Sequence, residues 1–219
     1  MRLQYEEMST QNVNGMRIYE TPQKQMYPSI TTILGRTVSE EKQKSLANWQ
    51  NSLGIKKANK ICKDACDRGT NVHLLIERFL NKEDLKREQF SQDDYNLFVS
   101  LKIKLNQITD VWAQEIPLYS DLLQIAGRCD AIGVYKGVPS IIDFKTSTRL
   151  KSAKDIEDYK LQCCFYGCAA NEMFGTDIQQ GVVLMAANPG FPLEFVFDLN
   201  PSVNTLADRV DEFYRKLNT

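Results

Sequence analysis

Three charged side chains in the second half of the chain, Asp130, Asp143 and Lys145, have the types and spacing for hydrolysis at a metal ion. Residues two apart on a β-strand point to the same face, so Asp143 and Lys145 would lie side by side. Carboxylate oxygens are the ligands that Mg²⁺ and Mn²⁺ prefer. The Asp-x-Lys pattern is also common as a solvated ion pair, so by itself it does not identify a site.

The dipeptide Lys136-Gly137 is typical of a tight turn between two antiparallel strands. Counting outward from this turn sets Asp130 directly opposite Asp143. Opposed side chains have Cβ atoms roughly 4.5–5.5 Å apart, and two carboxylates so placed repel each other unless a cation lies between them. The register therefore predicts a divalent-cation site, with Lys145 one pleat further along the same face. An irregular turn would break this register.

Two pairs of polar side chains have the i, i+4 spacing that places both members on one helix face. His73, the only histidine in the sequence, is followed four residues later by Glu77. Imidazole and carboxylate at this spacing suit a metal ligand and its hydrogen-bonded partner. Gln162 and Tyr166 form the second pair, on the helix expected after Lys145. Ordinary helix packing is the alternative interpretation of both pairs.

The elements that must position these residues change in character along the chain. Residues 1–27 are polar and predict a frayed arm or a short hairpin around Asn14-Gly15. Apolar periodicity, serine caps and glycine stops then predict helices over 39–53, 55–67 and 70–80, and another after Ser91. We expect a helix break at Arg68-Gly69-Thr70, between the second of these helices and the third.

The second half alternates strands with helices. Segments rich in β-branched and aromatic residues predict strands over 111–119, 125–135, 138–146, 180–187 and 193–199, with helices over 155–174 and 202–217. This order predicts an α/β sandwich with a central mixed β-sheet flanked by helices. We expect one domain over 1–219, with a helical N-terminal part at about 29–107 and a sheet core at about 110–199.

Composition limits the class of protein more than its function. The 27 basic and 28 acidic side chains give a net charge of −1, so bulk charge does not indicate nucleic-acid binding. Six cysteines, no visible signal peptide and no long apolar run predict a soluble protein with free thiols in a reducing compartment. We expect the cytoplasm of a bacterial or phage-infected cell, and a mitochondrial location stays open.

A local basic surface is nevertheless available beside the acidic residues. Its candidates for DNA contacts are Lys56, Lys60, Lys63 and Arg68 before His73, and Thr146, Ser147, Arg149 and Lys151 after Lys145. A stripe of lysines is often only a solvated helix face. Its position next to the chemical motifs favours binding of a nucleic-acid backbone.

Four motifs, in order along the chain, resemble those of the PD-(D/E)XK nucleases and, within them, the RecB-like exonucleases. They are Arg68-Gly69-Thr70-x-x-His73-x-x-x-Glu77, Gly127-x-x-Asp130, Asp143-Phe144-Lys145 and Gln162-x-x-x-Tyr166. The segments 27–34 and 143–147 also resemble the mitochondrial genome maintenance exonucleases and their phage relatives. The resemblance covers about 27–187 and implies a restriction-endonuclease-like sandwich.

The resemblance also implies roles for single residues. It implies that Mg²⁺ or Mn²⁺ is bound by His73, Asp130, Asp143 and the backbone carbonyl of Phe144. Lys145 would position or activate the attacking water, and Glu77 would orient His73 or hold a water. Gln162 and Tyr166 would brace the site and touch the DNA backbone.

Some RecB-like nucleases hold an iron–sulfur cluster with one upstream and three downstream cysteines. Here Cys163, Cys164 and Cys168 lie on the motif helix itself, and no cysteine follows them. We therefore expect no iron–sulfur cluster.

The function that the resemblance implies is that of a deoxyribonuclease, a hydrolase acting on phosphodiester bonds. We expect an exonuclease that prefers single-stranded DNA, in DNA replication, repair, recombination or phage DNA processing. The expected partners are DNA with a free end and replication or recombination proteins, with no membrane. Two alternatives stay open: a structure-specific or restriction-type endonuclease on the same fold, and a non-catalytic nucleic-acid-binding recombination partner.

Overall fold

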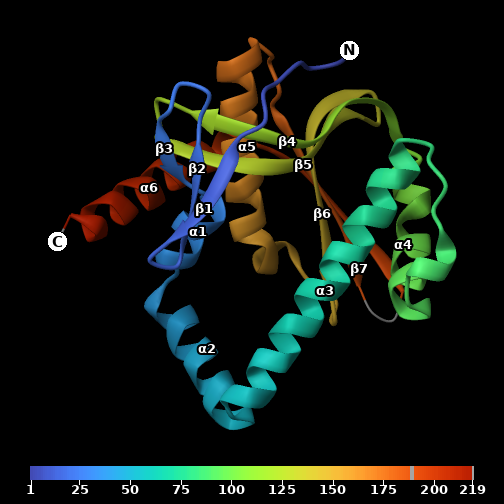
Figure 1. Cartoon of the computed structure of the whole chain (residues 1–219), viewed down its shortest axis with the longest axis horizontal. Coiled ribbons are helices and arrows are strands. Elements are labelled where there is room, and N and C mark those ends of the chain that lie inside the picture. Colours follow the sequence, from blue (N-terminus) through green and yellow to red (C-terminus); the bar gives the residue numbers. More distant parts are fainter. Residues whose placement is uncertain (188–189, 219) are drawn as a thin grey trace.

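The computed structural model describes residues 1–187 and 190–218. Its centre is a five-stranded sheet of order β4-β5-β6-β7-β8 (Figure 1). The strands are β4 (Ile108–Ser120), β5 (Ile125–Tyr135), β6 (Val138–Ser147), β7 (Gln180–Ala187) and β8 (Phe191–Asp198). Strands β6 and β7 run parallel and the other neighbours antiparallel, so the predicted mixed sheet is confirmed.

Helices cover both faces of this sheet, as predicted for an α/β sandwich. On one face, α1 (Ile30–Arg36), α5 (Glu157–Phe174) and α6 (Val203–Leu217) enclose the larger hydrophobic core. On the other face, α3 (Ile55–Leu80) and α4 (Gln92–Leu105) enclose a second core. Successive side chains on a strand point to opposite faces of the sheet. Each helix layer therefore contacts every second side chain of β6.

The N-terminal arm forms a small antiparallel sheet of β1 (Ser9–Val13), β2 (Met16–Glu20) and β3 (Met26–Pro28). Asn14 and Gly15 make its first turn with φ angles of 51° and 74°. Positive φ at both central residues is what a tight hairpin turn requires, and asparagine and glycine tolerate it. Of the two predicted forms of this arm, the hairpin is the one that the structure contains.

Serine side chains start three of the helices. Ser29, Ser39 and Ser91 each accept a hydrogen bond from a backbone N–H in the first turn of α1, of α2 (Glu40–Leu53) and of α4, respectively. Such caps satisfy donors that the first turn of a helix leaves free. Short 3₁₀ turns lie at Arg87–Gln89, Ala153–Ile156 and Asn200–Ser202.

The break predicted at Arg68-Gly69-Thr70 is wrong, because α3 continues through it as one helix of 26 residues. A glycine inside a helix costs only about 1 kcal/mol relative to alanine. The buried side chains of Val72, Leu75 and Ile76 pack the helix against the sheet beyond this point, and that packing outweighs the cost. The uninterrupted helix joins the exposed first half of α3 rigidly to His73.

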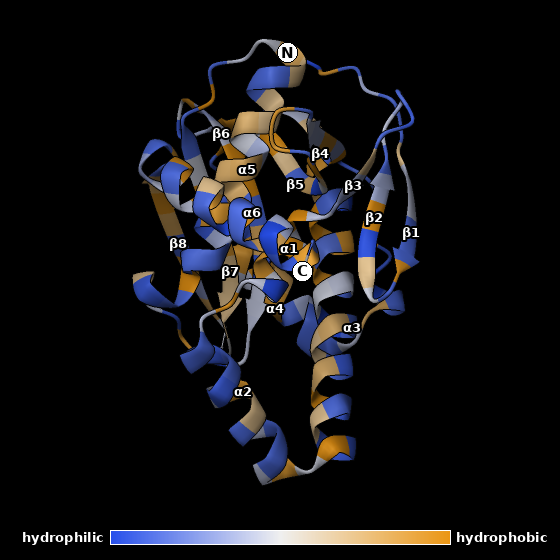
Figure 2. Cartoon of the chain, turned by 90° about the vertical axis from the view of Figure 1, so that its left-hand side faces the viewer, coloured by the Kyte–Doolittle hydropathy of each residue, from blue (hydrophilic) through white to orange (hydrophobic). Residues whose placement is uncertain are grey.

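Helix α2 and the first half of α3 project from the body as the two sides of a V (Figures 1 and 2). None of the described residues of α2 is buried. Gly54, with a φ of 77°, forms the corner between the two helices. We call these two segments, Glu40–Leu53 and residues 55–67, the arch. Among the described residues, no helix combines the length and apolar character needed to span a membrane.

Candidate metal centre

The candidate site lies where strands β5 and β6 part. Their pairing follows the predicted register from the turn as far as Ala131 opposite Ile142, and there it ends. The predicted direct pairing of Asp130 with Asp143 is not made. Instead, Asp130 Oδ2 accepts a hydrogen bond of 2.7 Å from the backbone N–H of Phe144. The Asp130 side chain therefore takes the place of further backbone pairing between β5 and β6. We call the gap between the two strands beyond this point the opening.

His73 reaches this opening from α3. Its Nε2 lies 2.8 Å from the carbonyl oxygen of Phe144, and its Nδ1 lies 3.7 Å from Asp130 Oδ1. The imidazole is half-buried, with 28% of its side chain exposed. The structure thus brings together three of the four predicted metal-binding groups: the imidazole, the Asp130 carboxylate and the Phe144 carbonyl.

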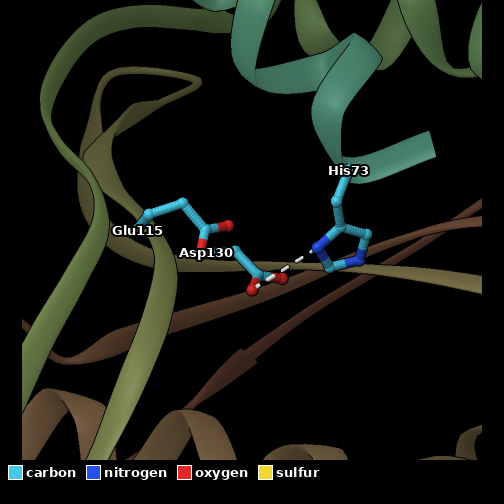
Figure 3. A group of neighbouring side chains, drawn as sticks. All are labelled: His73, Glu115 and Asp130. Carbon is cyan, nitrogen blue, oxygen red and sulfur yellow. Dashed lines mark ion pairs between the residues drawn. The ribbon is translucent and has the colours of Figure 1, made fainter. Parts of the chain in front are cut away.

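Glu115 of β4 is the third side chain at this point, and the sequence reasoning missed it. One ligand atom from each of His73, Glu115 and Asp130 lies within 4.8 Å of the others. The three side chains come from three different elements and converge on one place (Figure 3). We call this group the His73–Glu115–Asp130 cluster.

Burial and like charge make the Glu115 carboxylate unusual. Its pKa is raised to about 7, first because burial disfavours the charged form and then because Asp130 repels it. Glu77, half-buried one helical turn after His73, adds to this repulsion. A cation between the carboxylates would offset their mutual repulsion.

Asp143 and Lys145 lie beside the cluster and face each other, as their spacing predicts. Lys145 Nζ is 2.5 Å from both carboxylate oxygens of Asp143, but the geometry of a hydrogen bond is met only at Oδ1. Burial raises the pKa of Asp143 despite its lysine partner. Asp143 is not one of the three residues of the cluster, but the charges of Asp130 and His73 act on its carboxylate, and its role as a metal ligand stays a prediction.

One oxygen of Asp143 nevertheless makes an ion pair without a hydrogen bond. Within the described part of the chain, Asp143 Oδ2 is the buried side-chain oxygen or nitrogen that makes no hydrogen bond. The Lys145 ammonium lies beside this oxygen, but the oxygen keeps lone pairs that no hydrogen bond uses, and a bound cation could accept them. Two further carboxylates, an imidazole and a backbone carbonyl stand close by. This donor set fits a hard divalent cation such as Mg²⁺ or Mn²⁺.

The Gln162 and Tyr166 pair braces the site from α5. Gln162 Nε2 donates to the Tyr166 hydroxyl at 3.0 Å, and that hydroxyl donates to the backbone carbonyl of Arg128 at 2.7 Å. These two hydrogen bonds connect α5 to the β5 backbone two residues from Asp130, which is the contact that the predicted bracing would need. Tyr166 is only 2% exposed, so its side chain is too deeply buried for the DNA contact expected of it.

The basic residues predicted to contact DNA fall into two groups. Lys56, Lys60 and Lys63 are exposed on the α3 side of the arch, while Arg149 and Lys151 follow β6. Because an α-helix rises about 1.5 Å per residue, Lys56 lies about 25 Å along α3 from His73. The two groups therefore lie on different elements, α3 and the segment after β6.

Arg68 and the hydroxyl residues predicted with it lie nearer to Lys145. Arg68 and Ser147 line a cavity of about 270 Å³ beside the end of β6. Ser147 is buried and its hydroxyl donates to the carbonyl of Arg149 at 2.6 Å, so that hydroxyl is used within the loop. Thr146 is half-buried and faces Gly69 of α3.

Comparison with known proteins agrees with this geometry. Mitochondrial genome maintenance exonuclease 1 of Mus musculus is 25% identical over 177 residues, covering 78% of this chain and 52% of that protein. The Homo sapiens protein of the same name is 25% identical over 182 residues, with the same two coverages. The chain thus spans about half the length of these relatives.

A solved candidate exonuclease from Eubacterium rectale aligns with a TM-score of 0.45 and 16% identity, covering 69% of this chain and 66% of that one. The family model described as the PD-(D/E)XK nuclease superfamily matches residues 47–190, which is more than half of the chain. That match includes His73, Glu115, Asp130, Asp143 and Lys145. On this evidence, the chain belongs to the PD-(D/E)XK nuclease superfamily.

Proposed function

We propose that the protein is a metal-dependent DNA exonuclease that prefers single strands. The observation that carries this proposal is the opening between β5 and β6, where the His73–Glu115–Asp130 cluster meets the Asp143–Lys145 pair. Acidic metal ligands beside a half-buried lysine are a combination suited to hydrolysis of a phosphodiester. Family membership supports the reaction class, since this is a superfamily of nucleases.

The residues of the site have three proposed roles: holding the cation, contacting the phosphate or water, and supporting the β5 backbone. His73, Glu115, Asp130 and the Phe144 carbonyl would hold the cation, with Asp143 Oδ2 available as a further ligand. A divalent cation there supplies charge that lowers the pKa of water and offsets charge developing on a phosphate. The Lys145 ammonium, 19% exposed, can donate to a phosphate oxygen or hold the attacking water. Gln162 and Tyr166 keep the β5 backbone in place beneath these groups.

The preference for single strands is supported by the arch. Between α2, α6 and the loop after β6 lies an open hollow of about 1090 Å³. Its described lining includes four basic side chains and no acidic one: Arg36, Lys42, Arg149 and Lys216. Trp49 also lines it, and an aromatic ring among basic groups suits a flexible, single nucleic-acid strand. In a duplex the bases are stacked inside the double helix, so the Trp49 ring could not stack on them.

Exonuclease activity, rather than internal cutting, is supported by the names of the mouse and human relatives. The Gln162–Tyr166 brace supports the RecB-like branch of the superfamily that the motifs resemble. Exonuclease activity and membership of the RecB-like branch are proposed for this chain, which spans about half the length of those relatives.

The test uses end-labelled linear single strands and circular single strands, each with Mg²⁺, with Mn²⁺ and with a chelator. We expect nucleotide release from the linear strand only, and only with the metal. Asp143→Ala should reduce the rate by at least about 100-fold, because it removes a carboxylate that would help to hold the cation. Lys145→Ala should reduce it by a similar factor, because it removes a positive charge that can face the reacting phosphate. Asp208→Ala, which removes an exposed aspartate from α6, is the matched control and should keep the full rate.

The outcomes separate the alternatives. Cutting of the circle would replace the exonuclease with an endonuclease on the same fold. Binding of the strands without release of nucleotides, in any metal, would leave a non-catalytic DNA-binding protein. Full activity of Lys145→Ala in Mg²⁺ would remove Lys145 from the reaction.

A further inference from the structure

We propose that Arg128 is a positioning residue that holds Glu115 in the His73–Glu115–Asp130 cluster. This inference rests on the proposed function, since it concerns the cation that the cluster would bind. Arg128 itself lies on β5, two residues before Asp130, and does not belong to the cluster.

Glu115 requires an external support because its own strand does not hold it. The β4–β5 pairing passes from Gln114 to Ile116 without including Glu115. The residue has a φ of 48°, in the left-handed region that side chains other than glycine and asparagine rarely adopt. Its carboxylate also points toward Asp130, which repels it. Backbone strain and charge both favour movement of Glu115 away from the cluster.

The Arg128 guanidinium opposes that movement. Its Nη1 donates to the backbone carbonyl of Glu115, and its Nη2 donates to Glu7 Oε2 at 2.7 Å. The guanidinium is a rigid fork, so anchoring one branch at Glu7 fixes the direction of the other. The Glu115 carbonyl thus has a charged donor in the Arg128 guanidinium. The positive charge also attracts the Glu115 carboxylate and lowers its pKa.

The backbone of Arg128 is held just as firmly from the other side of the sheet. Its carbonyl accepts the hydrogen bond from Tyr166, which Gln162 supports in turn. One residue therefore connects α5 to the Glu115 backbone and stands two positions from Asp130. Groups that orient metal ligands without touching the metal typically change its affinity 10- to 100-fold when they are removed.

A purely structural role would be to fasten the N-terminal segment through Glu7. Three variants separate the two roles. Arg128→Met removes both donors and keeps the apolar stem, and Arg128→Lys keeps the charge but loses the fork. Glu7→Gln weakens the N-terminal anchor but leaves the donor to the Glu115 carbonyl in place. Arg87→Met is the matched control, because Arg87 also donates to a backbone carbonyl, that of Phe90 at 2.8 Å, away from the cluster.

The first readout is Mn²⁺ affinity without DNA, measured by electron paramagnetic resonance of the free ion. We expect Arg128→Met to weaken the affinity by about 10-fold or more and Arg128→Lys by a smaller factor. Glu7→Gln should have a smaller effect than either, and Arg87→Met none. The second readout is the Mg²⁺ concentration that gives half-maximal nucleotide release, which should rise in parallel while the affinity for DNA stays the same.

A double variant gives the decisive result. In a Glu115→Gln background, Arg128→Met should weaken Mn²⁺ binding no further, because the group that it positions is gone. An equal loss in both backgrounds, or a loss no greater than that of Glu7→Gln, would overturn the inference. If Arg128→Met does not fold, Arg128→Lys decides the question, and wild-type Mn²⁺ affinity in that variant would also overturn it.

The same measurements distinguish the two proposals. If the wild-type protein binds Mn²⁺ through Glu115 but releases no nucleotides, the proposed function fails and the role of Arg128 stands. If the wild-type protein cuts DNA but Arg128→Met leaves Mn²⁺ affinity unchanged, the role of Arg128 fails alone.

Discussion

The Lys145 ammonium contacts two groups, the carboxylate of Asp143 and the ring of Tyr159. The Asp143 carboxylate lies against its ammonium on one side, and the ring of Tyr159 lies on another, with Nζ 5.1 Å from the ring centroid. An ammonium over an aromatic face is attracted to it by about 0.5–2 kcal/mol, more as water is excluded. Tyr159 is half-buried on the first turn of α5, one turn before Gln162. Its ring would keep Lys145 in place when Asp143 turns toward a cation.

Replacing Tyr159 by leucine tests this contact. We expect Tyr159→Leu to lower the rate of nucleotide release by about 2- to 30-fold, the equivalent of the attraction that is lost. Tyr159→Phe keeps the aromatic face and should keep most of the rate. The measurement is the initial rate at saturating DNA and Mg²⁺, with the melting temperature as a control for folding. Equal losses in both variants would assign the effect to the hydroxyl group instead.

Single residues differ in how far the sequence predicts them. Asp130, Asp143, Lys145 and His73 could be proposed from the sequence, because motif spacing places each on a defined face and the resemblance to a nuclease family links the motifs. Glu115 could not, because its carboxylate joins the cluster through a positive φ and a gap in strand pairing. Neither feature has a signal in the residue types around it. Pairing β4 against β5 in the register of Gln114 with Ala131 would have placed Glu115 opposite Asp130.

At the scale of elements, Gly127 sets how closely α5 approaches β5. A Cβ atom at Gly127 would lie 2.9 Å from the Tyr166 ring, 3.2 Å from Ile30 and 3.3 Å from Phe165. All three neighbours are buried, so none can move aside freely. The glycine of the Gly-x-x-Asp motif thus has a packing role: it lets the Tyr166 hydroxyl reach the carbonyl of Arg128.

We therefore expect Gly127→Ala to lower the free energy of unfolding by about 1–3 kcal/mol, the usual cost of overpacking a core. Nucleotide release should fall as well, because the brace under Asp130 is displaced. Urea titration measures the first effect. Gly35→Ala is the control, since Gly35 lies in α1 with no atom within 4 Å of its Cβ position. It should leave stability unchanged or raise it by up to about 1 kcal/mol. Equal stability of Gly127→Ala and wild type would contradict this account.

Glu194 connects its own strand, β8, to α4 and to the end of β5, away from the site. Burial by itself raises its pKa, but hydrogen bonds from Lys104, Lys136 and Tyr135 outweigh burial and hold the pKa at about 2. Because the folded-state pKa lies below the ordinary value of 4.5, this carboxylate stabilises the fold above about pH 4.5. The contribution is lost as the pH falls from there toward 2.

Glu194→Gln should therefore lower the free energy of unfolding at pH 7 by about 2–3 kcal/mol. The gap between variant and wild type should narrow as the pH falls from about 4.5 toward 2, since the wild-type carboxylate becomes protonated. Thermal unfolding at a series of pH values measures the gap. A gap that stays constant with pH would show that the lost charge is not its cause.

Elements were predictable where local rules decide them and not where tertiary packing does. The turn at Lys136-Gly137 fixed the β5–β6 register as far as Ala131, because hairpin geometry is local. The same local reasoning failed at Gly69, where packing of α3 on the sheet overrides a helix-breaking residue. It also failed at the end of the β5–β6 ladder, because the carboxylate of Asp130 competes with the backbone for the N–H of Phe144.

At the scale of the whole molecule, charge is nearly balanced and yet unevenly placed. The net charge of −1 gives no general attraction for DNA. The acidic cluster lies at the opening in the sheet, whereas Lys56, Lys60 and Lys63 lie on the arch. A strand that follows the arch would meet basic groups along its backbone and reach the acidic centre only at the reacting phosphate. The attraction is thus local, and we expect it to be sensitive to salt.

Reversing charge on the arch gives the matching prediction. Each phosphate contact on a single strand contributes about 0.7 to the slope of log affinity against log salt. Lys56→Glu with Lys60→Glu should therefore weaken binding to a single strand and reduce that slope by about 1.4. The measurement is fluorescence anisotropy of a labelled strand over a range of salt concentrations. Metal affinity should stay unchanged, because Lys56 and Lys60 lie about 25 Å and about 20 Å from His73 along α3.

Lys82→Glu with Lys86→Glu makes the same change of charge on exposed residues outside the arch, between α3 and α4. This control separates a contact with the strand from an effect of net charge. If both double variants lose affinity and slope equally, the strand responds to total charge and the arch has no special part. If neither loses any, the strand approaches the site by another path. Only loss confined to the Lys56 and Lys60 variant places the strand along the arch.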